Sequence, residues 1–513
     1  MQPFLYIFGG LFMKNLKTAV IIGAGTGGIA TAIFLAQKGF KVIVYEQSDA
    51  PGGRCSRIVR DGHRFDLGAT IFLMPEIYRD VFKALGIPFD QAISYQPVSD
   101  IYRLYFTDGT TFRFTTDRKV MEKQMEAMEP GSYSRFLAYV EKGYGFYKIA
   151  LKELLGRNYT SLFQFITLRN ICVLFRIKTL ISHMRYVRRF FKHPHLQTAF
   201  TFQNIYVGQN PFTAPALFAM LPAAEITQGS LVAQGGMFSV VEALQKKAED
   251  LGVKIHCNSS VSRILTTGNK TTGVELEDGK FIPSDIVVAN ADLPYVYKEL
   301  LQEKGHASLL DKLKYSCSAI SFHWALDKPY SQLGLHNVFM SEKYKHNLDK
   351  IFRDKTVSGD PSFYVYCPRE SDPGSAPEGQ DTMSVVVPVG HLHRKNKNQW
   401  DKLAKTVREG VLERLEQQGF TDLEKHIKFE ICLMPETWEK NFHITKGSVF
   451  GSISHFILQM GYFRPHNRHR RYHNLYFTGG STHPGNGVPL VLMSAQLTSE
   501  RIFEDMQDES SRS

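Results

Sequence analysis

Near the amino terminus, two short apolar runs flank a segment with helical spacing. Residues 18–22 (TAVII) and 41–45 (KVIVY) have the length and composition of buried parallel strands. Between them, apolar residues recur at helical spacing from Ile29 to Ala36, and Gly39 ends that pattern. The pattern predicts a strand–helix–strand unit with both strands in one parallel sheet.

The turn between the first strand and the helix is rich in glycine. Residues 23–28 (GAGTGG) form a G-x-G-x-x-G pattern in a strand–turn–helix setting. Glycines there allow a tight turn and a close approach of a pyrophosphate to the helix N-terminus. Glu46 follows the second strand, 21 positions after Gly25, where an acid hydrogen-bonds a ribose hydroxyl. Together these features predict a dinucleotide site that prefers FAD or NAD to NADP.

Two later blocks show the same alternation of strands and glycine turns. After Gly235 and Gly236 the pattern predicts a helix ending at Gly252, then strands over 253–256, 261–265, 273–276 and 285–292. Near the carboxyl terminus it predicts a strand over 474–478, a compact loop over 479–487 and a helix over 488–502. We expect all three blocks to build one discontinuous domain.

Basic residues are concentrated in one stretch. The chain has 61 Lys and Arg against 50 Asp and Glu, a net charge of +11. No acid lies between Glu153 and Glu225, whereas residues 157–192 hold eight Arg and Lys among many apolar residues. This mixture is typical of a helix in the headgroup layer of an anionic membrane, and equally of a helical subdomain with a basic solvated face. Nucleic-acid binding ranks third because no recognition motif accompanies the charge.

Composition excludes several classes of protein. Hydrophobic residues make up 43% and charged residues 22%, which excludes a disordered or fibrous chain. The six cysteines lie far apart, which excludes a disulfide scaffold or clustered zinc site and favours a reducing, cytoplasmic setting. No run reaches the roughly 18 apolar residues of a membrane span. Residues 1–12 lack the features of a secretory signal, so we interpret them as an upstream start or a loose extension.

Two histidine-containing segments lack the surroundings that a catalytic or metal site requires. His466, His469 and His473 have helix-like spacing, but three arginines in the same segment would repel a cation, so we expect a basic surface and no metal. Ser481 and His483 lack the G-x-S-x-G elbow of a hydrolase. We assign no catalytic acid or base.

Four segments carry a resemblance to a known family: Gly52-Gly53-Arg54, 65–86 (FDLGATIFLMPEIYRDVFKALG), 206–222 (YVGQNPFTAPALFAMLP) and 481–496 (STHPGNGVPLVLMSAQ). With them the chain resembles the bacterial-type phytoene and dehydrosqualene desaturases, carotenoid desaturases among the GGR-type FAD flavoproteins. The likeness runs from about 18 to 502. One departure is Ala69, where the family commonly has proline, so the loop and the substrate preference are less fixed.

The resemblance implies an α/β fold with three parts. These are a discontinuous Rossmann-like FAD-binding domain, a mixed-sheet substrate domain, and the helical, basic, membrane-facing segment 157–192. We expect FAD-binding parts at 14–100, 226–310 and 446–505, and substrate-domain parts at 101–225 and 311–445.

The motifs and the resemblance also imply which residues hold FAD. In the family, the residue at Val261 contacts adenine through its backbone. Backbone N–H groups at the start of the last helix would face the electron-rich edge of the reduced flavin ring. We expect His483 to shape the loop before this helix, with contact to substrate as the alternative. The candidate cofactor-binding residues are Gly23, Ala24, Gly25, Thr26, Gly27, Gly28, Glu46, Gln47, Gly53, Arg54, Gly68, Ala69, Val261, Ala289, Asn290, Gly479, Gly480, Gly487, Val488 and Pro489.

The implied function is FAD-dependent desaturation of a long apolar polyene in carotenoid biosynthesis, with hydride transfer to flavin. A sister desaturase or oxidase acting on dehydrosqualene, a hydroxycarotenoid or a diaponeurosporene-type substrate is the nearest alternative. A flavin amine oxidase and a non-redox prenyl-binding escort protein are more distant ones. We expect a cytoplasmic protein bound peripherally to anionic lipid, with quinone or oxygen as terminal acceptor and no nucleic-acid partner.

Overall fold

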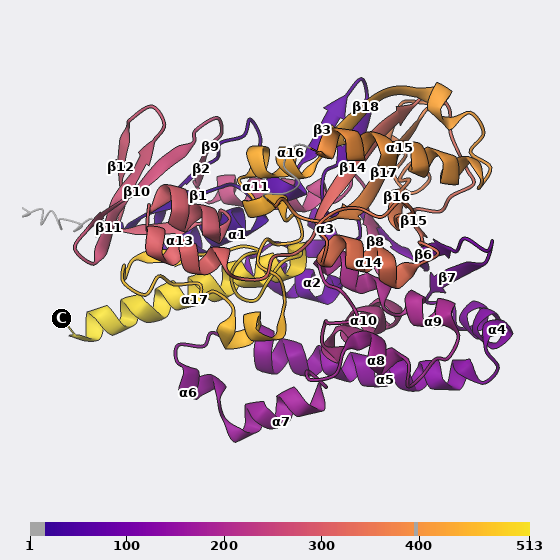
Figure 1. Cartoon of the computed structure of the whole chain (residues 1–513). Helices are drawn as coiled ribbons and strands as arrows, with labels where there is room; N and C mark the ends of the chain where they lie inside the picture. Colours follow the sequence, from indigo (N-terminus) through magenta and orange to yellow (C-terminus); the bar gives the residue numbers. More distant parts are fainter. Residues whose placement is uncertain (1–15, 394–398, 513) are drawn as a thin grey trace, which may run out of the picture.

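The computed structural model describes residues 16–393 and 399–512. Residues 1–12, interpreted above as an extension, lie outside the described residues. Two large sheets and a helical layer make up the described chain (Figure 1).

A five-stranded parallel sheet forms the dinucleotide half of the molecule. Its order is β19 (Leu475–Phe477), β13 (Ile286–Ala289), β1 (Thr18–Ile22), β2 (Lys41–Tyr45) and β9 (Lys254–His256). Helix α1 (Thr26–Gln37) contacts both α11 (Phe238–Asp250) and α17 (Val488–Arg512). Strands from three distant segments therefore build one sheet, which confirms the discontinuous Rossmann-like domain. Helix α17 runs beyond the predicted end at 502 because Phe503 and Met506 still pack on the core of this domain.

Small antiparallel sheets extend this half. Their strands are β10 (Val261–Thr267), β11 (Lys270–Leu276) and β12 (Phe281–Pro283) in one sheet, and the pairs β3 (Arg57–Arg60) with β4 (His63–Asp66) and β5 (Tyr95–Val98) with β8 (Ser230–Ala233). The helices here are α2 (Pro75–Ala84), α3 (Phe89–Ala92), α12 (Leu293–Tyr295) and α13 (Lys304–Asp311).

A seven-stranded mixed sheet forms the second half, as expected. Its order is β18 (Ile427–Leu433), β14 (Ser318–Leu326), β17 (Asp381–Val389), β16 (Phe363–Tyr366), β15 (His336–Phe339), β6 (Asp100–Tyr105) and β7 (Thr111–Thr115). Only β15 and β6 pair in parallel; the other neighbours are antiparallel. Trp324 and Trp400 are fully buried in its core. The accompanying helices are α14 (Tyr344–Phe352), α15 (Trp400–Glu416) and α16 (Pro435–Phe442).

A layer of helices covers the lower side of the molecule in Figure 1. It holds α4 (Arg118–Met128), α5 (Ser132–Ala150), α6 (Leu162–Phe165), α7 (Leu168–Arg176), α8 (His183–Val187), α9 (Pro194–Ala199) and α10 (Met220–Gln228). The segment 157–192 is three short helices and not one, because Thr167 and Ser182 each cap a new helix with a side-chain hydrogen bond. Lys178, with a φ of 55°, lies in the turn after α7.

The domain boundaries given above remain a prediction. All four boundaries, at 100/101, 225/226, 310/311 and 445/446, fall inside an element: β6, α10, α13 and the short 3-10 helix Thr445–Gly447. Within 16–393 and 399–512, no helix combines the length and apolar character needed to cross a membrane.

Candidate active site

A cavity of about 760 Å³ lies between the parallel and the mixed sheet. Gly23, Glu46 and Asn290, which directly follow β1, β2 and β13, line one end. Ser321 of β14 and Tyr364 of β16 line another part. Ligands of parallel α/β sheets bind outside the carboxyl ends of the strands. The cavity therefore connects the predicted dinucleotide site with the mixed sheet.

The glycine turn after β1 leaves the start of α1 facing this cavity. Gly25 is the N-cap residue of α1, and no side chain caps the helix. Gly23 has a φ of +93°, a conformation that favours glycine. A Cβ on Gly28 would lie 2.1 Å from the Gly23 carbonyl oxygen, so that position also requires glycine. Backbone N–H groups at the positive end of the helix dipole form an anion site here.

The carboxylate of Glu46 is buried at the wall of the same cavity. Its Oε2 accepts the Ala24 N–H at 2.7 Å and its Oε1 accepts the Ser48 N–H at 2.9 Å. These bonds fix the carboxylate beside the glycine turn. Since an ionised carboxylate has about four lone-pair positions, both oxygens keep capacity for ribose hydroxyls.

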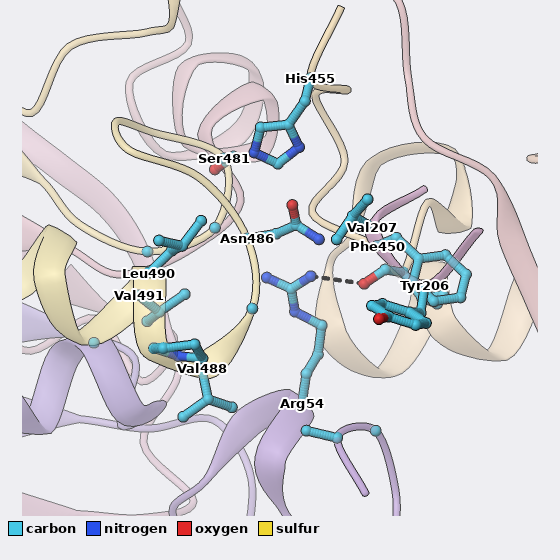
Figure 2. A pocket seen from close by; sticks show the side chains of 18 of the residues that line it. Arg54, Tyr206, Val207, Phe450, His455, Ser481, Asn486, Val488, Leu490 and Val491 are labelled. Atoms are coloured by element: carbon cyan, nitrogen blue, oxygen red, sulfur yellow. Dashed lines mark hydrogen bonds between the residues drawn. The ribbon is translucent and has the colours of Figure 1, made fainter. Parts of the chain in front are cut away.

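Arg54 extends across the cavity toward Asn486, with His455 beyond (Figure 2). Its Nη1 donates to the Val449 carbonyl at 2.8 Å. Burial lowers the pKa of Arg54, and the nearby carboxylate of Asp292 opposes this shift. The guanidinium is therefore a fixed positive group in the interior of the cavity.

The loop before α17 is held from two sides. Arg464 donates to the carbonyls of Gly480 at 2.6 Å and Thr482 at 2.8 Å. The Ser494 hydroxyl accepts the Gly479 N–H at 3.2 Å. Helix α17 begins directly after this loop, and its first turn lies along one wall of the cavity in Figure 2.

Most predicted cofactor residues line this one cavity. The exceptions are Ala24, Gly28 and Ala289, which are not part of the lining. Ala24 is a buried residue of the turn, Gly28 lies against the Gly23 carbonyl, and Ala289 is the last residue of β13. The contact of each candidate residue with FAD, these three included, stays a prediction.

Two polar groups in the cavity wall, those of His455 and Asn486, lie outside the predicted set. His455 is buried, and in the described chain neither of its ring nitrogens has a hydrogen-bond partner. Burial, then the charge of Arg464, holds the pKa of His455 well below its usual range, so the ring is neutral. The Oδ1 atom of Asn486 likewise lacks a partner within the described residues. Asn486 lies within a recognised motif, whereas residues around 455 carry no local pattern that could have identified them.

The part of the cavity away from the glycine turn is mainly aromatic and aliphatic. Phe202, Tyr206 and Leu217 belong to its lining. Tyr102 and Tyr206 donate their hydroxyls to the buried carboxyl of Glu225. Burial raises the pKa of Glu225 to about 8. The network satisfies the tyrosine hydroxyls and leaves an apolar wall.

The cavity reaches the surface among exposed apolar side chains, here called the rim. Its members belong to the cavity lining and are also exposed: Ile171, Phe175, Leu180, Leu458 and Phe463. The rim continues into an apolar patch on α6 and α7, which comprises Leu162, Phe163, Ile166 and Leu168. Phe163 is 88% exposed and Leu168 is 80% exposed. Large exposed apolar patches mark interaction surfaces.

The expectation of a basic surface at 466–473 is wrong for His469. This side chain is 4% exposed, and its Nδ1 accepts the backbone N–H groups of Arg471 and Tyr472, each at 3.0 Å. These bonds turn the chain inward and bury the ring, whereas His473 is exposed. No group of three His, Cys, Asp or Glu arranged as metal ligands occurs in the described chain.

Comparisons with known proteins agree with this architecture. The family model for flavin containing amine oxidoreductases matches residues 26–503. Among solved structures, putrescine oxidase bound to putrescine has a TM-score of 0.56 at 14% identity, covering 95% of this chain and 99% of that chain. An oxidoreductase from Methanosarcina mazei has a TM-score of 0.57 at 16% identity, covering 94% and 100%. These identities show a shared fold, that of a flavoprotein of the amine oxidoreductase type.

Curated relatives are closer in sequence. Phytoene desaturase of Fusarium fujikuroi is 37% identical over 512 residues, covering 95% of this chain and 90% of that protein. The zeta-carotene-forming phytoene desaturase of Myxococcus xanthus is 39% identical over 489 residues, covering 95% and 94%. The 4,4'-diapophytoene desaturase (4,4'-diaponeurosporene-forming) of Staphylococcus aureus strain Newman is 32% identical over 502 residues, covering 96% and 99%. The chain belongs to the flavin-containing amine oxidoreductase family, alongside these desaturases.

The site fits the FAD of this family. The start of α1 offers uncapped N–H groups to a diphosphate, and Glu46 retains lone pairs for ribose hydroxyls. A Cβ at Gly25 would lie 3.0 Å from Asn290 Nδ2, a tight contact, so glycine leaves the most room beside the turn. Both the family and the geometry of the glycine turn and Glu46 therefore support FAD as the cofactor.

Proposed function

We propose that this protein is an FAD-dependent carotenoid desaturase that removes hydrogen from C–C single bonds of a phytoene-type polyene. The observation that carries the proposal is the continuous cavity, which joins a glycine-lined dinucleotide end to an apolar end with an exposed rim. A long polyene needs such an apolar channel beside a two-electron acceptor. The activities named for the related desaturases support this substrate class.

The residues of the chain bind and orient the reactants. When bound, FAD would supply the acceptor for a hydride from one carbon, while the second hydrogen leaves the neighbouring carbon as a proton. The start of α1 and Glu46 hold the dinucleotide, while Phe202, Leu217 and their neighbours align the polyene and exclude water. Arg54 provides a fixed positive charge inside the cavity.

We further propose that the protein docks peripherally on anionic membranes through the apolar patch and rim. A polyene dissolves in lipid, and the rim is where the cavity opens. Exposed basic side chains beside the patch, such as Arg176, Lys178 and Arg185, suit a negatively charged lipid surface. Quinone or oxygen as the terminal acceptor remains part of the proposal.

Product analysis tests this function. The FAD-loaded protein is incubated with vesicles that contain phytoene or its shorter relative 4,4'-diapophytoene, and the polyenes are separated by chromatography and identified by their absorption spectra. We expect coloured, desaturated products from phytoene, and a higher yield than from 4,4'-diapophytoene. A protein that holds FAD yet leaves both polyenes unchanged would refute the proposal.

A further inference from the structure

A second cavity, here called the basic cavity, is lined by residues within 158–160 and 461–470, by His483 of the loop before α17 and by Arg501 of α17. It has a volume of about 250 Å³, the space of ~8 water molecules at liquid density. Its lining includes Arg464, Arg468, Arg470 and Arg501, and no Asp or Glu side chain. Of the described residues, only Gly461 lines both this cavity and the cavity of about 760 Å³.

The positive charge in the basic cavity is only partly balanced. Asp505 pairs with Arg468 at 3.0 Å and with Arg501 at 3.4 Å, and Glu504 lies 3.6 Å from Arg501. Within 16–393 and 399–512, neither Arg464 nor Arg470 has a carboxylate partner. The cavity therefore holds more positive charge than its own acids neutralise.

Arg464 is the buried group at this site. Its side chain is 1% exposed, and its Nε and Nη2 donate to the carbonyls of Thr482, Gly480 and Ile453. Its Nη1 is buried and has no partner among the described residues. Leaving a buried charged donor unpaired costs free energy, and an anion would remove that cost. Burial lowers the pKa of Arg464 to about 9, a shift that an anion would oppose.

The basic cavity also adjoins the rim. Its lining includes Tyr159 and Thr160, which precede the apolar patch, and Gly461 and Tyr462, which lie between Leu458 and Phe463 of the rim. An anion in this cavity would therefore lie close to the surface through which we propose that the protein meets lipid.

We propose that the basic cavity is a binding site for a phosphate-type anion, with Arg464 and Arg470 as its principal ligands. Two sources share this chemistry: free inorganic phosphate and the phosphomonoester headgroup of a lipid. Anion binding itself is independent of the proposed desaturase function, and only the lipid source rests on the proposed membrane docking.

The test compares two neighbouring arginines. Arg470→Gln removes an exposed side chain of the cavity lining without disturbing the core. Arg471→Gln removes the same charge from the next residue, which is also exposed but is not part of the lining. Arg464→Gln is a second variant, used where it retains the wild-type melting temperature. Each FAD-loaded protein is titrated with inorganic phosphate by calorimetry. Each is also mixed with phosphatidylcholine vesicles that carry equal charge as phosphatidic acid or as oleate. No polyene is present, so failure of the desaturase proposal would not affect the result.

Saturable phosphate binding that weakens by ~10-fold or more in Arg470→Gln, and by less than about twofold in Arg471→Gln, would support a free anion as the ligand. A preference for phosphatidic acid over oleate that disappears only in Arg470→Gln would support a lipid headgroup. Equal behaviour of Arg470→Gln and Arg471→Gln in both measurements would overturn the proposal.

Discussion

Replacing Phe163 and Leu168 together by serine should detach the protein from membranes and leave its flavin in place. These side chains are 88% and 80% exposed, and both belong to the apolar patch. Fully burying a Phe or Leu side chain contributes roughly 1.5–3 kcal/mol, so the two exposed fractions together are worth about 2.5–5 kcal/mol on insertion. The vesicle partition coefficient should therefore fall by ~60-fold to ~4,000-fold.

Cosedimentation with phosphatidylcholine–phosphatidylglycerol vesicles over a range of lipid concentrations measures this change. The substitutions leave the net charge unchanged, so electrostatic attraction is constant across the series. Phe281→Ser with Leu309→Ser is the matched control, because these side chains are 48% and 60% exposed on β12 and α13, outside the patch. A partition coefficient for the Phe163 and Leu168 variant within twofold of wild type, with flavin retained, would show that the patch does not insert.

Two further changes test the cavity. Gly25→Val should fold, because Gly25 has an ordinary φ of −69°, yet lose FAD affinity by at least ~100-fold. The control Gly410→Ala, with nothing within 4 Å of its Cβ, should keep FAD. Equal flavin content in both variants would contradict the assignment of Gly25 to the FAD site. Burial raises the pKa of Glu225 to about 8, whereas the unfolded chain releases this proton near pH 4.5. The native state therefore holds a proton that the unfolded chain has lost, and its stability should fall as the pH rises from about 4.5 to about 8. Glu225→Gln should flatten that dependence in melting curves, whereas an unchanged slope would exclude Glu225 as its source.

Local patterns were sufficient for the parallel sheet and its cofactor end. The run 18–22, the glycine turn and Glu46 lie within one short segment, and the structure places them together at the cavity. The strands at 286–289 and 475–477 were also predictable, because buried parallel strands are continuous apolar runs.

The rest of the cavity could not be predicted, because tertiary contacts create it. His455 and Glu225 become buried only when distant segments pack around them, and neither lies in a pattern of its own. The segment 157–192 divides into short helices because Thr167 and Ser182 compete for backbone N–H groups, which hydrophobic spacing does not reveal. His469 was expected at the surface because of its basic neighbours, but hydrogen bonds to the backbone bury it.

An anaerobic mixing experiment tests the central claim most directly. The FAD-loaded protein is mixed with phytoene-containing vesicles in the absence of any other acceptor, and the visible spectrum is recorded. We predict that the oxidised flavin band bleaches while the absorption bands of a longer conjugated polyene grow in proportion. A flavin band that stays oxidised, with phytoene unchanged, would contradict the account.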